Sequence, residues 1–122
     1  MKTVAVIGAS NNRAKFGNKA VRAYQAQGYR VIPVNLTEPV VEGLPAFKSV
    51  LDIPDPVDMA TVYVPPEATL AVLAELERKQ VPEIWINPGA ESDEVIAEAR
   101  RRGLNAIFAC SIVAIGRSPY HF

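Results

Sequence analysis

The beginning of the chain limits the fold more than any other feature. Residues Thr3 to Ile7 form a β-branched apolar run that stops at a Gly8-Ala9-Ser10 turn. Such a run predicts a buried strand, and apolar residues at helical spacing predict a helix over about 18–27, ended by Gly28. A buried strand, a glycine turn and a helix in this order are typical of an α/β domain.

The same alternation continues to residue 108. Strands are predicted over 29–34, 59–64, 83–86 and 105–108, and helices over 66–79 and 92–102. Prolines and glycines predict an irregular stretch over 36–51, with a short extended piece at Val40-Val41. Near-continuous apolar strands are typical of parallel sheets covered on both sides. We therefore expect one domain over residues 1–122, a Rossmann-like doubly wound sheet of about five parallel strands with helices on both faces.

Charge is distributed unevenly along this chain of zero net charge. The segment 1–37 carries six lysines and arginines and no acid, and it contains the glycine turn. Chance placement of solvated charges is one interpretation, and a site for a small anionic ligand is the other. A neutral chain without an extended basic face does not favour nucleic-acid binding.

The apolar run at the N-terminus is too short for a signal sequence or a membrane span. The single cysteine, Cys110, cannot form an intrachain disulfide, which favours a reducing compartment. We expect a cytoplasmic protein that binds no membrane.

Ligands of such sheets bind outside the carboxyl ends of the strands. The candidate ligand-binding residues follow those ends and are Gly8, Ala9, Ser10, Arg13, Lys15, Phe16, Gly17, Asn18, Pro33, Val34, Asn35, Val64, Pro65, Pro66, Asn87 and Gly89. Gly17 is expected to let backbone approach a phosphate at a helix N-terminus, with Ser10 and Asn18 donating hydrogen bonds. On this hypothesis, Gly17→Val blocks binding in a protein that still folds. A tight turn without a ligand is the alternative.

Two of these segments bear on the kind of nucleotide. A dinucleotide site places a carboxylate at the end of the second strand, where this chain has Asn35, so classical NAD binding is disfavoured. The pair Pro65-Pro66 forms a rigid apolar ledge suited to an adenine ring, or else it only starts the following helix. The turn at Asn87 and Gly89 is explained equally well by turn chemistry alone.

Catalytic groups are scarce in the sequence. The only histidine, His121, is next to the last residue, and Cys110 has no neighbouring base in the sequence. No paired carboxylates, metal-ligand spacing or serine elbow is present. The sequence favours a binding protein over an enzyme, without deciding the matter.

Several short motifs, in order, resemble the small CoA-binding domain proteins. They lie at residues 4–10, 15–18, 28–35, 52–58, 64–67 and 83–86, and the likeness covers about 3–110. That family is similar to the CoA-binding N-terminal domain of the succinyl-CoA synthetase α subunit. The resemblance implies that the Gly8 turn and the start of the helix near Gly17 hold a pyrophosphate. It also implies that 33–35 and 64–66 border the adenosine, and that Arg13, Lys15 or Lys19 pairs with the 3′-phosphate.

The sequence therefore predicts a protein that binds coenzyme A or a short acyl-CoA without catalysing a reaction itself. A regulator that binds NAD(P) or another adenine nucleotide is the first alternative. A CoA-binding subunit of a larger acyl-CoA ligase-type complex is the second. The sequence leaves the oligomeric state open, a homodimer included.

Overall fold

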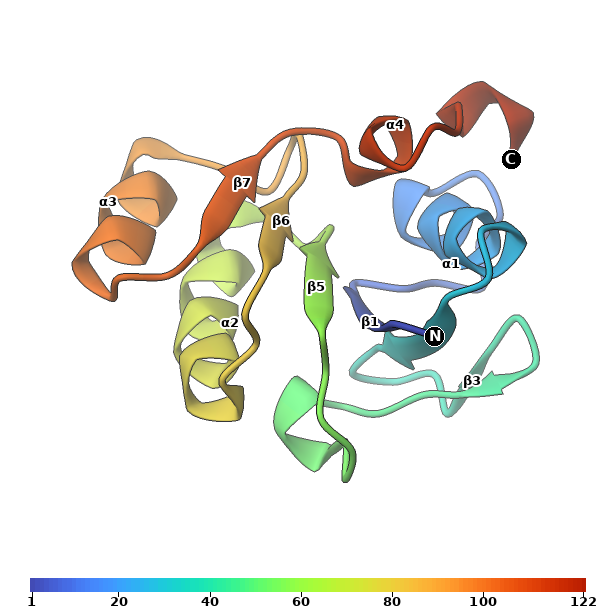
Figure 1. The fold of residues 1–122 in the computed structure, drawn as a ribbon, viewed down its shortest axis with the longest axis horizontal. Helices are drawn as coiled ribbons and strands as arrows, with labels where there is room; N and C mark the ends of the chain where they lie inside the picture. Colours follow the sequence, from blue (N-terminus) through green and yellow to red (C-terminus); the bar gives the residue numbers. More distant parts are fainter.

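The computed structural model describes residues 1–122 and contains a five-stranded parallel sheet (Figure 1). The strands lie in the order β2 (Arg30–Val34), β1 (Thr3–Ile7), β5 (Met59–Val62), β6 (Ile84–Ile86) and β7 (Ala106–Phe108). All four neighbouring pairs are parallel. The predicted Rossmann-like sheet is confirmed.

The helices cover both faces of the sheet. Helix α1 (Phe16–Ala26) packs on one face, and α2 (Pro66–Lys79) and α3 (Asp93–Arg101) lie on the other (Figure 1). The short helices α4 (Ser111–Ala114) and η2 (Pro119–His121) lie beside α1. No helix has the length and apolar character needed to cross a membrane.

The irregular stretch contains a small hairpin, β3 (Val40–Val41) with β4 (Leu44–Pro45), followed by the 3₁₀ turn η1 (Val50–Asp52). It also pairs with the sheet, because an isolated parallel bridge joins Phe47 to Val34 of β2. The prediction of a short extended piece at residues 40–41 is confirmed, but the bridge was not predicted.

The side chains of β1 alternate between two apolar cores, as the pleat of a strand requires. Val4 and Val6 point toward α1, whereas Ala5 and Ile7 point toward α2 and α3. All four are buried. Burial on both faces fixes the position of β1 and of the turn that follows it.

Local signals place the helix ends close to the predicted positions. The Ser92 hydroxyl accepts a hydrogen bond from Val95 N at 3.1 Å, which caps α3. Pro66 occupies the first turn of α2, and Gly28 follows α1 with a φ of +83°. Helix α1 starts at Phe16, two residues before the predicted start.

Pro33 lies inside β2, which is an edge strand. The carbonyl of Val34 accepts from Gly8 N at 3.0 Å, so the backbone N of Pro33 lies on the opposite, outer side of the strand. A proline is tolerated there because no neighbouring strand needs its missing N–H.

Helix α1 returns the chain to one side of β1, while β5 lies on the other side. The order of the strands therefore reverses between β1 and β5. The carboxyl ends of these two strands are where such sheets bind ligands.

Candidate functional site

The turn after β1 requires glycine at Gly8. Its φ is +91°, and a Cβ there would lie 3.1 Å from the backbone carbon of Tyr63 and from Val64 Cγ1. Both the backbone conformation and the close approach therefore exclude a side chain. As a result, the turn lies directly against the segment that leaves β5.

Gly17 brings helix α1 onto this turn. The residue is buried, and a Cβ on it would lie only 2.1 Å from the carbonyl oxygen of Gly8. The expectation that Gly17→Val leaves the protein folded is therefore wrong, because the valine would collide with backbone. The need for glycine here comes from packing between helix and turn.

The side chain of Asn18 is fully buried and fully hydrogen-bonded. Its amide nitrogen donates to the carbonyl of Ser10 at 2.8 Å and to Glu42 Oε2 at 2.9 Å. Its oxygen accepts from Arg22 Nε at 2.7 Å. In this conformation Asn18 has no free donor for a phosphate and holds the glycine turn instead.

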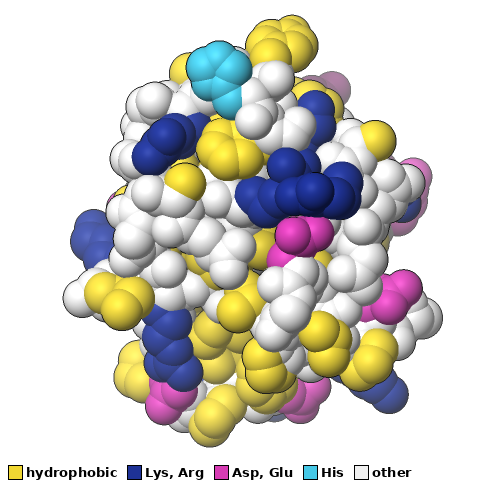
Figure 2. Space-filling view, turned by 90° about the vertical axis from the view of Figure 1, so that its right-hand side faces the viewer, with side chains coloured by type: hydrophobic (Ala, Val, Ile, Leu, Met, Phe, Trp, Pro, Cys, Tyr) yellow, Lys and Arg dark blue, Asp and Glu magenta, His cyan; other side chains and the backbone are white.

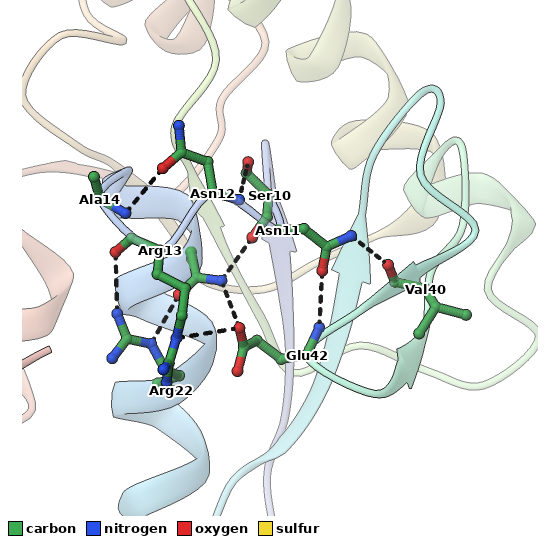
Figure 3. A network of polar contacts seen from close by, with 9 residues as sticks. Ser10, Asn11, Asn12, Arg13, Ala14, Arg22, Val40 and Glu42 are labelled. Atoms are coloured by element: carbon green, nitrogen blue, oxygen red, sulfur yellow. Dashed lines mark hydrogen bonds and ion pairs between the residues drawn. The ribbon is translucent and has the colours of Figure 1, made fainter.

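The hairpin of β3 and β4 is fastened to the loop before α1 (Figure 3). Asn11 donates to Val40 O at 2.8 Å and accepts from Glu42 N at 3.3 Å. Arg13 Nε lies 3.5 Å from Glu42 Oε2. Asn11 and Arg13 of the loop and Asn18 of α1 thus all contact the hairpin of β3 and β4, which is far away in sequence.

Basic side chains gather on this side of the molecule. Figure 2 shows a band of Lys and Arg with an acidic side chain directly below it. Two of the predicted phosphate partners are already engaged, since Arg13 pairs with Glu42 and Lys19 lies 5.2 Å from the ring centre of Phe16. Lys15 is exposed at the start of α1.

A cavity of about 530 Å³ opens beside Gly8 on the α2 side of the sheet. Four of the predicted site residues line it, namely Gly8, Val34, Asn35 and Val64. They come from the ends of β1, β2 and β5, which the fold brings together at the switch point. The lining is mostly apolar, as is usual for pockets that bind small molecules.

The remaining lining was not predicted from the sequence. One side of α2 supplies four of these residues, the loop after β2 and the segment before η1 supply three, and β1 and η1 supply one each; the residues are Ile7, Leu36, Thr37, Lys48, Val50, Ala68, Ala71, Val72 and Glu75. The spacing of the four α2 residues was a usable signal, because it puts them on one helix face. Lys48 gave no such signal.

Asn35 organises the end of β2. Its amide nitrogen donates to Ala9 O at 2.7 Å, and its oxygen accepts from the backbone nitrogens of Thr37 and Glu38, each at 2.8 Å. The end of β2 is therefore tied to the turn after β1. Any ligand group at this position meets an amide and not a carboxylate.

Other predicted site residues have structural partners outside the cavity. Pro65 and Pro66 start α2, and Asn87 is buried, with its amide donating to Thr61 Oγ1 at 2.6 Å and its oxygen accepting from Ser111 N at 2.9 Å. Gly89 is exposed with a φ of +97°. Ligand contacts by these four residues, and by Ser10, Phe16 and Pro33, stay predictions.

A buried hydroxyl cluster lies near the carboxyl end of β5, on the α1 face. Ser111 Oγ lies 2.7 Å from Thr61 Oγ1 and 3.2 Å from the Tyr63 hydroxyl. Burial raises the pKa of Tyr63 to about 12, opposed in part by its hydrogen bonds. Burial also raises the pKa of Tyr24, whose hydroxyl has no hydrogen-bond partner. Both phenols are therefore neutral at physiological pH.

The ionisable side chains that line the cavity are Lys48 and Glu75. No set of three or more His, Cys, Asp or Glu side chains is placed to hold a metal ion. Cys110 is half-buried at the start of α4. The geometry is that of a nucleotide-binding α/β domain with a glycine turn, a helix N-terminus and an apolar cavity at one edge.

The comparison with protein families agrees with this class. The family described as CoA binding domain matches residues 2–116, so the chain belongs to the CoA-binding domain family. The resemblance noted in the sequence is confirmed.

Relatives of known activity are much longer proteins. The α subunit of an ADP-forming acetate–CoA ligase of Pyrococcus furiosus is 42% identical over 79 residues, which are 64% of this chain and 17% of the subunit. A second such ligase, of Archaeoglobus fulgidus, is 37% identical over 107 residues, or 16% of its length. The chain thus spans about a sixth of these two ligases.

Solved structures include chains of similar size. A conserved hypothetical protein of Pyrococcus furiosus superposes with a TM-score of 0.85 at 32% identity, covering 93% of this chain and 99% of the other. An acetyl-coenzyme A synthetase of Candidatus Korarchaeum cryptofilum superposes with a TM-score of 0.77 at 26% identity, covering 88% of this chain and 26% of the other. The same fold therefore occurs both alone and within large ligases.

Proposed function

We propose that the chain binds coenzyme A, free or with a short acyl group, along the carboxyl edge of the sheet. The observation that carries the proposal is the cavity of about 530 Å³ that adjoins the Gly8 turn in a CoA-binding domain. The pyrophosphate would lie at the turn and the start of α1, where backbone N–H groups and the helix dipole favour anions. The adenine ring would occupy the apolar cavity.

The end of β2 favours CoA over NAD. An NAD site uses a carboxylate there for the ribose hydroxyls, whereas this chain presents Asn35, already bonded to Ala9 O. Calorimetry with CoA, NAD, NADP and ATP tests the preference. We expect CoA to bind most tightly. Micromolar NAD binding in the absence of millimolar CoA binding would overturn the proposal.

A cavity-filling variant tests the location. Ala71 is exposed on α2 and lines the cavity, so Ala71→Trp should fill the space with an indole ring and weaken CoA binding by at least about tenfold. Ala97→Trp is the matched control, because Ala97 is exposed on α3 and lines a second depression that Ala71 also borders, but not the cavity. Calorimetry should show normal CoA affinity for the control, and unchanged affinity in Ala71→Trp would place the ligand elsewhere.

A second candidate is a CoA-binding subunit of a larger ligase-type assembly. The observation that favours it is the 42% identity to one part of an ADP-forming acetate–CoA ligase subunit. On this proposal the reaction takes place with groups of a partner protein. Purification of the tagged chain from its native cells should then recover a stoichiometric partner, and recovery of the chain alone would argue for the simple binding protein.

A further inference from the structure

The cations predicted for the 3′-phosphate lie away from the cavity. Arg13 is paired with Glu42, Lys19 lies over Phe16, and neither of them nor Lys15 lines the cavity. All three come from α1 or the loop before it, whereas the cavity opens on the α2 side of the sheet. Recognition of a phosphate on the ribose therefore calls for another group.

Lys48 is the one lysine or arginine that lines the cavity. It is exposed and takes part in none of the ion pairs of the structure. Its neighbours in the lining include Asn35 and Thr37 at the end of β2. In Rossmann-like sheets, the end of this strand is where the ribose lies.

The backbone on both sides of Lys48 is fixed. Phe47 is bridged to β2, with Phe47 N donating to Pro33 O at 3.0 Å and Asn35 N donating to Phe47 O at 2.9 Å. Ser49 accepts from Leu51 N at 3.1 Å and donates to Glu75 of α2. Lys48 therefore leaves the backbone at a defined point, next to the residue that pairs with Asn35.

The hydrogen bond donated by Ser49 also holds the acidic side chain of the cavity. Glu75 is the only carboxylate in the lining, and it accepts a hydrogen bond from the Ser49 hydroxyl. The ammonium group of Lys48 is the only positive charge in the lining, and the Glu75 carboxylate, which keeps its charge, is held by Ser49.

On the basis of the proposed CoA site, we propose that Lys48 recognises the phosphate on the ribose of the nucleotide. In CoA this group is the 3′-phosphate, which 3′-dephospho-CoA lacks. Lys48 determines specificity between these two ligands and leaves the pyrophosphate to the turn and α1. This assigns to a residue before η1 the role that the family resemblance implied for Arg13, Lys15 or Lys19.

Calorimetry with CoA and 3′-dephospho-CoA tests the proposal in the wild-type protein, Lys48→Met and Lys15→Met. Methionine keeps the length and apolar stem of lysine, so each variant removes mainly the charge. We expect the wild-type protein to prefer CoA by about tenfold, the usual value of one charged hydrogen bond. Lys48→Met should lose this preference, because its affinity for CoA falls while its affinity for 3′-dephospho-CoA stays the same. Lys15→Met should keep the preference.

The possible failures are distinguishable. If the wild-type protein binds neither ligand, the proposed function fails. If it binds both equally, or if Lys48→Met keeps the preference for CoA, the assignment of Lys48 is overturned while the CoA site stands. Loss of the preference in Lys15→Met alone would return the role to the start of α1.

Discussion

Gly17 lies so close to the Gly8 turn that the smallest side chain cannot be added without movement of the backbone. A Cβ at this residue would meet the carbonyl oxygen of Gly8 at 2.1 Å. We expect Gly17→Ala to lower the free energy of unfolding by about 3 kcal/mol, because an overpacked buried contact must be relieved by a shift of α1. Urea denaturation followed by circular dichroism measures the change.

Gly28→Ala is the matched control for Gly17→Ala. A Cβ on Gly28 would meet nothing within 4 Å, and only its φ of +83° opposes a side chain. Gly28→Ala should therefore lower the free energy of unfolding by about 1 kcal/mol, a cost that comes from the backbone conformation alone. A loss in Gly17→Ala no larger than that in Gly28→Ala would contradict the close approach of α1 to the turn.

At the scale of elements, the hairpin of β3 and β4 depends on Glu42. The carboxylate accepts from the buried amide of Asn18 at 2.9 Å and lies 3.5 Å from Arg13 Nε. Glu42→Ala should destabilise the protein by about 1–3 kcal/mol, because a buried N–H of Asn18 loses its partner. Thermal and urea unfolding measure this loss.

Glu42→Gln separates the hydrogen bond from the charge. Glutamine can still accept from Asn18, and the lost ion pair involves an Arg13 side chain that is 66% exposed, so we expect a loss of about 0–1 kcal/mol. Equal losses in both variants would show that the charge, and not the bond to Asn18, holds the hairpin.

The elements themselves were predictable because their signals are local. The apolar run at 3–7, the cap at Ser92 and Pro66 in the first helical turn each act within a few residues, and each has the predicted effect. The bridge from Phe47 to Val34 depends on contacts across 13 residues of sequence, and no local pattern marks it. Lys48, which follows this bridge and lines the cavity, was missed for this reason.

At the scale of the whole molecule, the hydroxyl cluster joins the C-terminal segment to the sheet. Ser111 begins α4, and its hydroxyl and backbone N–H contact Thr61, Tyr63 and Asn87 of the central strands and the segments that follow them. No predicted element or site residue lies within residues 111–122. Polar contacts of this kind follow from tertiary packing, since none of the partners is a neighbour of Ser111 in sequence.

This cluster makes global stability sensitive to alkaline pH. Burial raises the pKa of Tyr63 from 10.0 to about 12, so between these values the unfolded chain releases a proton that the folded chain retains. The contribution is fully present below pH 10 and is lost as the pH rises toward 12, at up to about 1.4 kcal/mol per pH unit.

Tyr63→Phe should be about 1 kcal/mol less stable at pH 8, because the hydrogen bond to Ser111 is lost, but its stability should fall less steeply above pH 10. Urea unfolding at pH 8 to 11 measures both effects, and Tyr120→Phe, at a side chain that is 93% exposed, should follow the wild-type curve. Parallel pH curves for Tyr63→Phe and the wild-type protein would show that the Tyr63 phenol is not held neutral by the fold.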